Sequence, residues 1–173
     1  VVPRRLVSFQ HGTSTTRTAV PSQLDGTGLA AAIAFAGNGY ALIAPDYPGL
    51  GDSPGRHPYY VADAIGPAVA GMIEASQRVP GVPNGPVFLS GFSEGGWASL
   101  AALRVLESKA AAGEIASEVT DLAMRLCGGA ASRKEVGVER NFRDARAANV
   151  MAPTTDALYD FIGKAPTGLP LFG

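Results

Sequence analysis

The sequence predicts an α/β fold in which helices cover both faces of a parallel sheet. Three short apolar runs each lead through a loop into a helix-forming stretch, and this alternation is typical of parallel sheets. The runs lack the apolar–polar alternation of a strand that faces water, which indicates burial on both sides. The composition agrees, because 46% hydrophobic and 17% charged residues in a chain of 173 are typical of one globular domain.

The first expected unit spans residues 6–39. Residues 6–10 form a β-rich apolar run that ends at His11-Gly12-Thr13, which predicts a buried strand leading into a loop. Residues 24–38 are rich in alanine and predict a helix. Asn38-Gly39 then supplies a stop that tolerates a left-handed backbone.

Two further units follow the same order. Residues 40–44 predict a strand, and a helix is expected from Val61 or Pro67 to Arg78. Residues 87–90 predict the next strand, and residues 97–112 its helix. A fourth strand is expected at residues 122–127, after a polar segment at residues 113–121.

The pattern Gly91-Phe92-Ser93-Glu94-Gly95 lies between a predicted strand and a predicted helix. A Gly-x-Ser-x-Gly pattern in this context is typical of a nucleophile elbow, a strained turn that presents a serine hydroxyl at the end of a sheet. The Glu94 amide at the helix start would donate to a developing negative charge. The alternative is a glycine-rich turn in which Ser93 only caps the helix.

Several segments together resemble secretory lipases of the lipase A type, within the α/β-hydrolase superfamily. The resemblance covers roughly residues 5–130. It rests on Phe9-Gln10-His11-Gly12-Thr13, Val20-Pro21-Ser22, the run from Gly39 to Gly51, His57-Pro58-Tyr59 and Gly91-Phe92-Ser93-Glu94-Gly95-Gly96.

The resemblance implies a carboxylic ester hydrolase that forms an acyl-enzyme on a small-molecule or lipid ester, without a metal or organic cofactor. It also implies a helical cap after the sixth strand and a secreted or extracellular protein. On this interpretation, residues 1–150 are a partial α/β-hydrolase core, incomplete at both ends. Residues 151–173 then begin the cap or form a loose tail.

The resemblance also assigns the site. Ser93 is the expected nucleophile, and the backbone amides of Glu94 and Thr13 are the expected oxyanion donors. The residues expected to line the pocket are His11, Gly12, Tyr47 and His57. Both histidines precede Ser93, whereas the family places its acid and histidine after the serine. The chain is therefore expected to be a fragment that is nearly inactive alone.

The sequence leaves two alternative functions open and argues against two other classes. An inactive hydrolase-fold module that binds a ligand, or a serine peptidase on the same fold, are the alternatives. The net charge of −1 and the absence of a basic segment argue against nucleic-acid binding. The apolar runs are too short to span a bilayer, and the oligomeric state is not predicted.

Overall fold

Three parallel strands form the sheet. The computed structural model describes residues 5–24 and 26–150. The strands are β1 (Leu6–Gln10), β2 (Ala41–Ile43) and β3 (Val87–Gly91). They lie in the order β2-β1-β3, and Leu6 is opposite Ala41 on one side and Val87 on the other. Every residue of the central strand β1 is buried, including the polar residues Ser8 and Gln10, which confirms the predicted buried strand.

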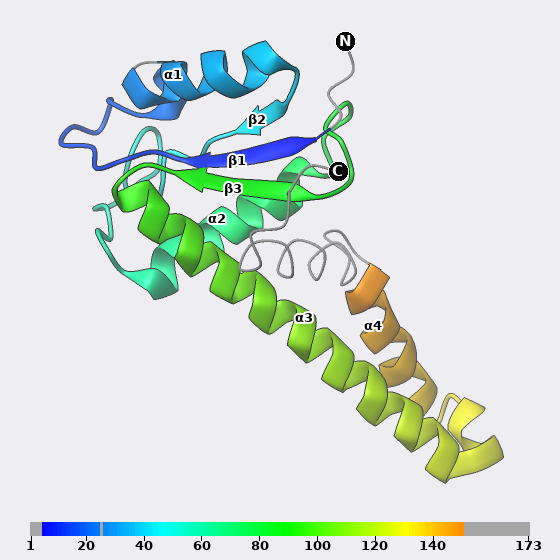
Figure 1. Ribbon diagram of the computed structural model, residues 1–173. Helices are drawn as coiled ribbons and strands as arrows, with labels where there is room; N and C mark the ends of the chain where they lie inside the picture. Colours follow the sequence, from blue (N-terminus) through cyan, green and yellow to red (C-terminus); the bar gives the residue numbers. More distant parts are fainter. Residues whose placement is uncertain (1–4, 25, 151–173) are drawn as a thin grey trace.

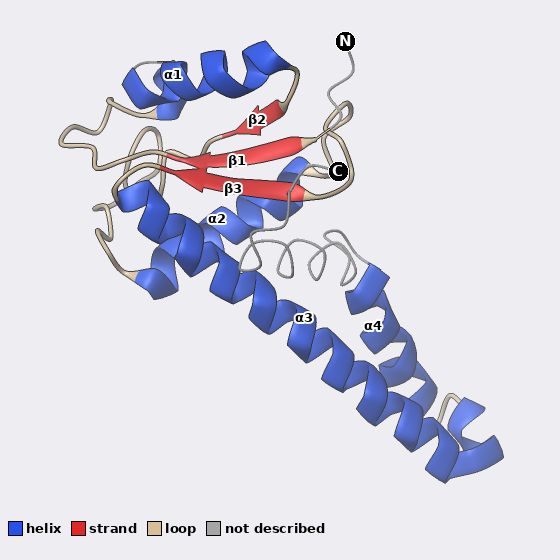
Figure 2. Ribbon diagram, viewed as in Figure 1, coloured by secondary structure: helices blue, strands red, loops and turns tan. Residues whose placement is uncertain are grey.

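Helices cover both faces of this sheet, as predicted. They are α1 (Gly26–Phe35), α2 (Ala62–Ser76), α3 (Glu94–Cys127) and α4 (Val138–Val150), with the short 3-10 segments η1 (Pro21–Gln23), η2 (Ala36–Asn38) and η3 (Gly128–Ser132). α1 lies on one side of the strands, and α2 and the first half of α3 lie on the other (Figure 1). Figure 2 shows the same layers by type of element. The α/β class with a small parallel sheet is therefore established.

The side chains of β1 alternate between these two helical layers. The ring of Phe9 lies 6.4 Å from that of Phe35 in α1. The side-chain amide of Gln10 faces the opposite layer and lies 2.9 Å from the Ser99 hydroxyl of α3. The hydrophobic core fills the α2–α3 side, with Ile65, Val69, Ile73, Ala102 and Leu106 among its buried members.

α3 continues well past the sheet. Figure 1 shows its distal half extending away from the strands, with α4 running back along it. We call residues 113–150 the helical arm. Its two helices are joined by polar contacts, because Asn149 donates to the Ser117 hydroxyl at 2.6 Å and Arg146 lies 3.0 Å from the Asp121 carboxylate.

The prediction of a strand at residues 122–127 is wrong, and the polar segment at residues 113–121 does not interrupt the helix before it. Both segments belong to α3. Its apolar residues Ile115, Val119, Leu122 and Leu126 are spaced by four, three and four positions, which is the spacing of one helix face. The residues between them are mostly good helix formers, so a short apolar run in this context does not become a strand.

The other predicted elements are confirmed with shifted boundaries. α2 begins at Ala62, which supports the earlier of its two expected starts, and Pro67 lies inside the helix. α3 begins at Glu94, three residues before the predicted start. Gly39 ends the segment after α1 with a φ of 85°, the left-handed conformation expected there.

Within residues 5–24 and 26–150, none of the helices combines the length and apolar character needed to cross a membrane. The expectation that residues 151–173 begin a cap or form a loose tail lies outside the described residues.

Candidate active site

Ser93 occupies a sharp turn between β3 and α3. Its backbone has φ 55° and ψ −118°, a conformation that L residues rarely adopt and that costs roughly 1–3 kcal/mol. The turn is closed by the Gly95 amide, which donates to the Phe92 carbonyl at 2.9 Å, and the Gly96 amide, which donates to the Ser93 carbonyl at 3.0 Å. The Ser93 side chain is exposed and makes no side-chain cap bond. The alternative of a simple helix cap is therefore not supported.

Two glycines make this turn sterically feasible. A Cβ added to Gly91 would lie 2.2 Å from the Gly95 carbonyl oxygen, and one added to Gly95 would lie 1.9 Å from the Gln10 carbonyl oxygen. Both distances are far below van der Waals contact. The Gly-x-Ser-x-Gly pattern thus has a steric basis, since only glycine lets the strand, the turn and the central strand β1 approach this closely.

The amides of Glu94 and Thr13 are available as donors. Among the described residues, no carbonyl accepts a hydrogen bond from either amide. Glu94 is the first residue of a 34-residue helix, where unpaired N–H groups and the helix dipole favour negative charge. Thr13 follows β1, so both amides come from the carboxyl ends of neighbouring strands.

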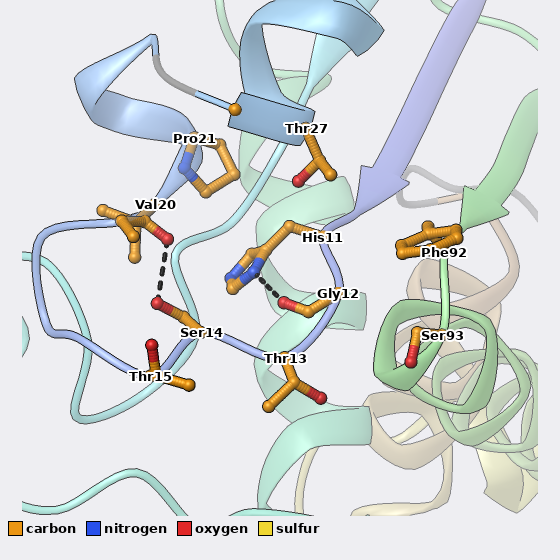
Figure 3. Close-up of a pocket in the computed structure, with 12 residues that line it drawn as sticks. His11, Gly12, Thr13, Ser14, Thr15, Val20, Pro21, Thr27, Phe92 and Ser93 are labelled. Atoms are coloured by element: carbon orange, nitrogen blue, oxygen red, sulfur yellow. Dashed lines mark hydrogen bonds between the residues drawn. The ribbon is translucent and has the colours of Figure 1, made fainter.

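Ser93 opens onto a cavity of about 330 Å³. Figure 3 shows Phe92 and Ser93 on one side of it and Ser14, Val20 and Pro21 on the other, with the segment from His11 to Thr13 between them. Hydroxyl and apolar groups dominate the lining, and none of the described lining residues is a carboxylate, lysine or arginine. The lining residues are His11, Gly12, Thr13, Ser14, Thr15, Ala19, Val20, Pro21, Gly26, Thr27, Phe92 and Ser93.

The ring of His11 is buried and both its nitrogens face carbonyl oxygens. Nδ1 lies 2.7 Å from the Gly12 oxygen and Nε2 lies 3.2 Å from the Asp46 oxygen. Because each ring nitrogen is directed at a carbonyl oxygen, neither is directed at Ser93. His11 instead ties the segment before Thr13 to the loop after β2.

Tyr47 packs on this ring. The two ring centroids are 4.3 Å apart and nearly parallel, and the Tyr47 hydroxyl donates to the His11 carbonyl at 3.1 Å. Burial, and secondarily the charge of Glu94, raise the pKa of the Tyr47 phenol above its usual value. The hydroxyl therefore remains a donor across the physiological pH range.

His57 and Glu94 form a pair beside the turn. His57 Nε2 lies 2.8 Å from Glu94 Oε1, and His57 Nδ1 lies 3.0 Å from the Pro48 carbonyl oxygen. Both ring nitrogens are again occupied. The Glu94 side chain is fully buried.

The structure thus brings some of the predicted site residues together and separates others. Ser93, Thr13, His11 and Gly12 line one cavity. His57 lines a shallower hollow that shares residues 13–15 with that cavity, and Tyr47 lines another near η1. Sequence reasoning missed Ser14, Thr15 and Thr27 as lining residues; only the density of hydroxyls in the loop after β1 could have indicated them.

Within residues 5–24 and 26–150, no group of three or more histidine, cysteine, aspartate or glutamate side chains is arranged to hold a metal ion.

A family model matches the helical part of the chain. The acyl-CoA dehydrogenase C-terminal domain matches residues 96–166, less than half of the chain. All residues of the Ser93 cavity lie before this segment. The match therefore concerns α3 and the helical arm rather than the cavity.

A solved structure is similar to the chain over a larger share of its length. It is the crystal structure of a presumed hydrolase from Legionella pneumophila subsp. pneumophila str. Philadelphia 1, with a TM-score of 0.55 and 29% sequence identity. The match covers 61% of this chain and 30% of that one, so the chain matches less than a third of that protein's length. No curated protein matches the sequence.

These findings correct the resemblance to secretory lipases, which is wrong. The matching family model describes a domain of acyl-CoA dehydrogenases, and the structural neighbour is described only as a hydrolase. The fold supplies a physical reason, because α3 runs away from the sheet where a lipase core would add its sixth strand. The specific architecture of an α/β-hydrolase core is accordingly not shown by the three-stranded sheet.

The functional assignment drawn from that resemblance is corrected with it. The matched dehydrogenase domain contradicts a carboxylic ester hydrolase, whether lipase or esterase, that acts in lipid degradation. The two alternatives, an inactive binding module and a peptidase on the same fold, lose their basis too, and the expectation of secretion is not carried further. Both comparisons nevertheless name enzymes, so at this coarser level the chain resembles enzymes.

Proposed function

We propose that the chain carries a hydrolytic site in which Ser93 is the nucleophile. The observation that carries the proposal is the backbone of Ser93, which has a positive φ and presents to the cavity a hydroxyl that has no hydrogen-bond partner among the described residues. Strain of this kind persists only where the surrounding structure enforces it, and it is concentrated at functional sites. The description of the structural neighbour as a hydrolase supports the same reaction class.

The amides of Glu94 and Thr13 complete the proposed site. When Ser93 Oγ attacks an electrophilic centre, a new bond to Oγ forms and negative charge develops on an oxygen of the substrate. Preorganised backbone N–H groups stabilise such charge strongly in a sheltered site. The hydroxyl proton passes to a base other than His11 and His57, because the nitrogens of both rings already face hydrogen-bonding partners.

The lining favours an uncharged substrate. Hydroxyl groups from Ser14, Thr15 and Thr27 and apolar surface from Val20 and Phe92 face the cavity. Arg17 is close in sequence, but its guanidinium donates to backbone carbonyls of residues 51, 53 and 55. A charged group entering the cavity would therefore lose its hydration without meeting an opposite charge.

A phosphonylating probe tests the proposal. A fluorophosphonate would form a P–O bond with Ser93 Oγ, release fluoride and displace the hydroxyl proton. Treatment of the complete protein should give one adduct that peptide mass spectrometry locates at Ser93. Ser93→Ala should abolish the adduct, whereas Ser108→Ala should leave it unchanged, since Ser108 is an exposed serine of α3 outside the site. Absence of an adduct at Ser93 in the folded wild-type protein contradicts the proposal.

The family match favours a second candidate, an acyl-CoA dehydrogenase activity associated with α3 and the arm. Dehydrogenation transfers electrons to an acceptor, whereas hydrolysis does not. An assay of the complete protein with acyl-CoA thioesters and an electron-accepting dye separates the two. Dye reduction that persists in Ser93→Ala would support the dehydrogenase candidate.

A further inference from the structure

Glu94 carries a buried carboxyl group whose second oxygen is unused. The side chain is 0% exposed. Oε1 faces His57 at 2.8 Å, whereas Oε2 has no hydrogen-bond partner among the described residues. A buried carboxyl group with an unpartnered oxygen costs free energy. Its position directly after the proposed nucleophile places this carboxyl group beside the site.

The hydrogen bonds of His57 define how the pair is protonated. The Pro48 oxygen can only accept, so His57 Nδ1 carries a hydrogen. The contact between Nε2 and Oε1 then needs a second proton, which lies either on the ring or on the carboxyl group. In both cases the pair is neutral overall and bridges α3 to the loop between β2 and α2.

This bridge continues to Thr13. The ring of Tyr59 meets that of His57 edge-on at 6.1 Å, and the Tyr59 hydroxyl lies 3.1 Å from Thr13 Oγ1. The Tyr47 ring stacks parallel to His57 at 5.8 Å from the other side. His57 and Tyr59 thus join the side chains of Glu94 and Thr13. These are the two residues whose amides donate to no carbonyl among the described residues.

We propose that Glu94, His57 and Tyr59 are positioning residues that hold the amides of Glu94 and Thr13 in place, so that both can donate to the same substrate oxygen. This inference rests on the proposed function of Ser93. The two amides come from separate loops, after β1 and after β3. The Phe92 amide donates to the Gln10 carbonyl at 3.1 Å and joins these loops where they leave the strands, but among the described residues no backbone hydrogen bond joins Thr13 itself to Glu94. The side-chain bridge adds a second link, at the two residues that carry the amides.

Tyr59→Phe tests the exposed end of the bridge without disturbing the core. Tyr59 is 51% exposed, and the variant keeps the ring while removing only the hydroxyl contact with Thr13. The rate constant for fluorophosphonate labelling of Ser93 should fall about fivefold, the factor that corresponds to one ordinary hydrogen bond. Thr13→Val should give a similar loss, and the double variant should be no slower than either single variant, because both changes remove the same contact.

Tyr60→Phe is the matched control. Tyr60 is the neighbouring tyrosine, is 48% exposed, and packs its ring on Tyr59 and Trp97. No hydrogen bond involves its hydroxyl among the described residues, so its labelling rate should equal that of the wild type.

Two variants of Glu94 test the buried end. Glu94→Gln can still donate from its amide to His57 Nε2, whereas Glu94→Leu removes the bridge while filling the space. Glu94→Gln should label at least about tenfold faster than Glu94→Leu, the factor expected for a hydrogen bond in a buried polar network. Equal rates in the two folded variants would overturn the bridge.

Backbone 15N relaxation measured by NMR provides a readout that does not depend on chemistry at Ser93. The order parameters of the Thr13 and Glu94 amides should fall from about 0.85 toward about 0.6 in Tyr59→Phe and stay unchanged in Tyr60→Phe. If the wild type fails to label but these amides respond, the proposed function is wrong and the bridge stands. If the wild type labels but Tyr59→Phe matches Tyr60→Phe in labelling and order parameters, the bridge is overturned and the proposed function stands.

Discussion

The sheet region and the helical arm share one helix but are held together differently. In the sheet region every residue of β1 is buried, and α3 buries Ala98, Ala102 and Leu106 against the core. In the arm, α3 buries only Gly113 and Ser117, and Ile115, Val119 and Leu126 are exposed. The positive φ of Ser93 is found next to the buried residues Glu94 and Gly95, at the end of α3 that packs on the sheet.

The match to a family model falls on one side of the same division. The family match begins at residue 96 and follows α3 into the arm, whereas the proposed nucleophile and its cavity lie before that residue. The proposed hydrolytic site therefore belongs to the sheet region, whereas the similarity to the acyl-CoA dehydrogenase domain belongs to α3 and the arm. The contrast between the two regions can be tested by paired substitutions.

The largest effect is expected for an added methyl group at the Ser93 turn. Gly95→Ala would place a Cβ 1.9 Å from the Gln10 carbonyl oxygen, so strand and helix must separate. We expect a loss of about 3 kcal/mol or more in the free energy of unfolding. Gly129→Ala in the arm meets no atom within 4 Å and should be nearly neutral. Urea denaturation followed by circular dichroism checks both, and similar midpoints would remove the contrast.

Truncation of two leucines on α3 sharpens the same comparison. Leu106 is 4% exposed and belongs to the core, whereas Leu126 is 78% exposed. Leu106→Ala should cost about 2–5 kcal/mol through the cavity that it leaves, and Leu126→Ala should stay within about 0.5 kcal/mol. Thermal melts of both variants measure the difference. A large loss for Leu126→Ala would show that the exposed face of the arm is covered in the protein.

Relief of the strain at Ser93 should stabilise the fold. Ser93→Gly removes the Cβ that makes a φ of 55° unfavourable. The free energy of unfolding should rise by about 1 kcal/mol, while fluorophosphonate labelling disappears. Ser93→Ala is the control, since it also lacks the hydroxyl but retains the strain. No gain of Ser93→Gly over Ser93→Ala would show that the turn is unstrained.

The smallest effect is expected for the ion pair between the arm helices. Arg146 and Asp121 are 3.0 Å apart, but both side chains are about half exposed. Arg146→Ala should cost about 0–1 kcal/mol, and the loss should shrink at high salt because solvent ions screen exposed charges. Denaturant midpoints at low and high salt measure it, with Asp121→Ala as the matched variant. A salt-independent loss would point to packing of the Arg146 side chain on Phe142 instead.

Local sequence patterns predicted the three strands well and the distal half of α3 poorly. The β-rich run of β1 and the left-handed stop at Gly39 depend on neighbouring residues, so both were predicted correctly. The segment at residues 122–127 was ambiguous, because a short and mostly apolar run fits a strand or a helix equally well. The resemblance to lipases failed because it extrapolated from motifs near Ser93 to a whole architecture.

By itself, the sequence determined the order of the three strand–helix units and the turn at residues 91–95. Glycine spacing and short apolar runs fix these features because they constrain the backbone of adjacent residues. Only the tertiary structure decided that Glu94 turns inward to His57, that both histidines are engaged by carbonyl or carboxyl oxygens, and that Thr13 lies at the Ser93 cavity. These contacts join residues that are tens of positions apart. Their geometry depends on how the loops after β1, β2 and β3 pack together, which no local pattern encodes.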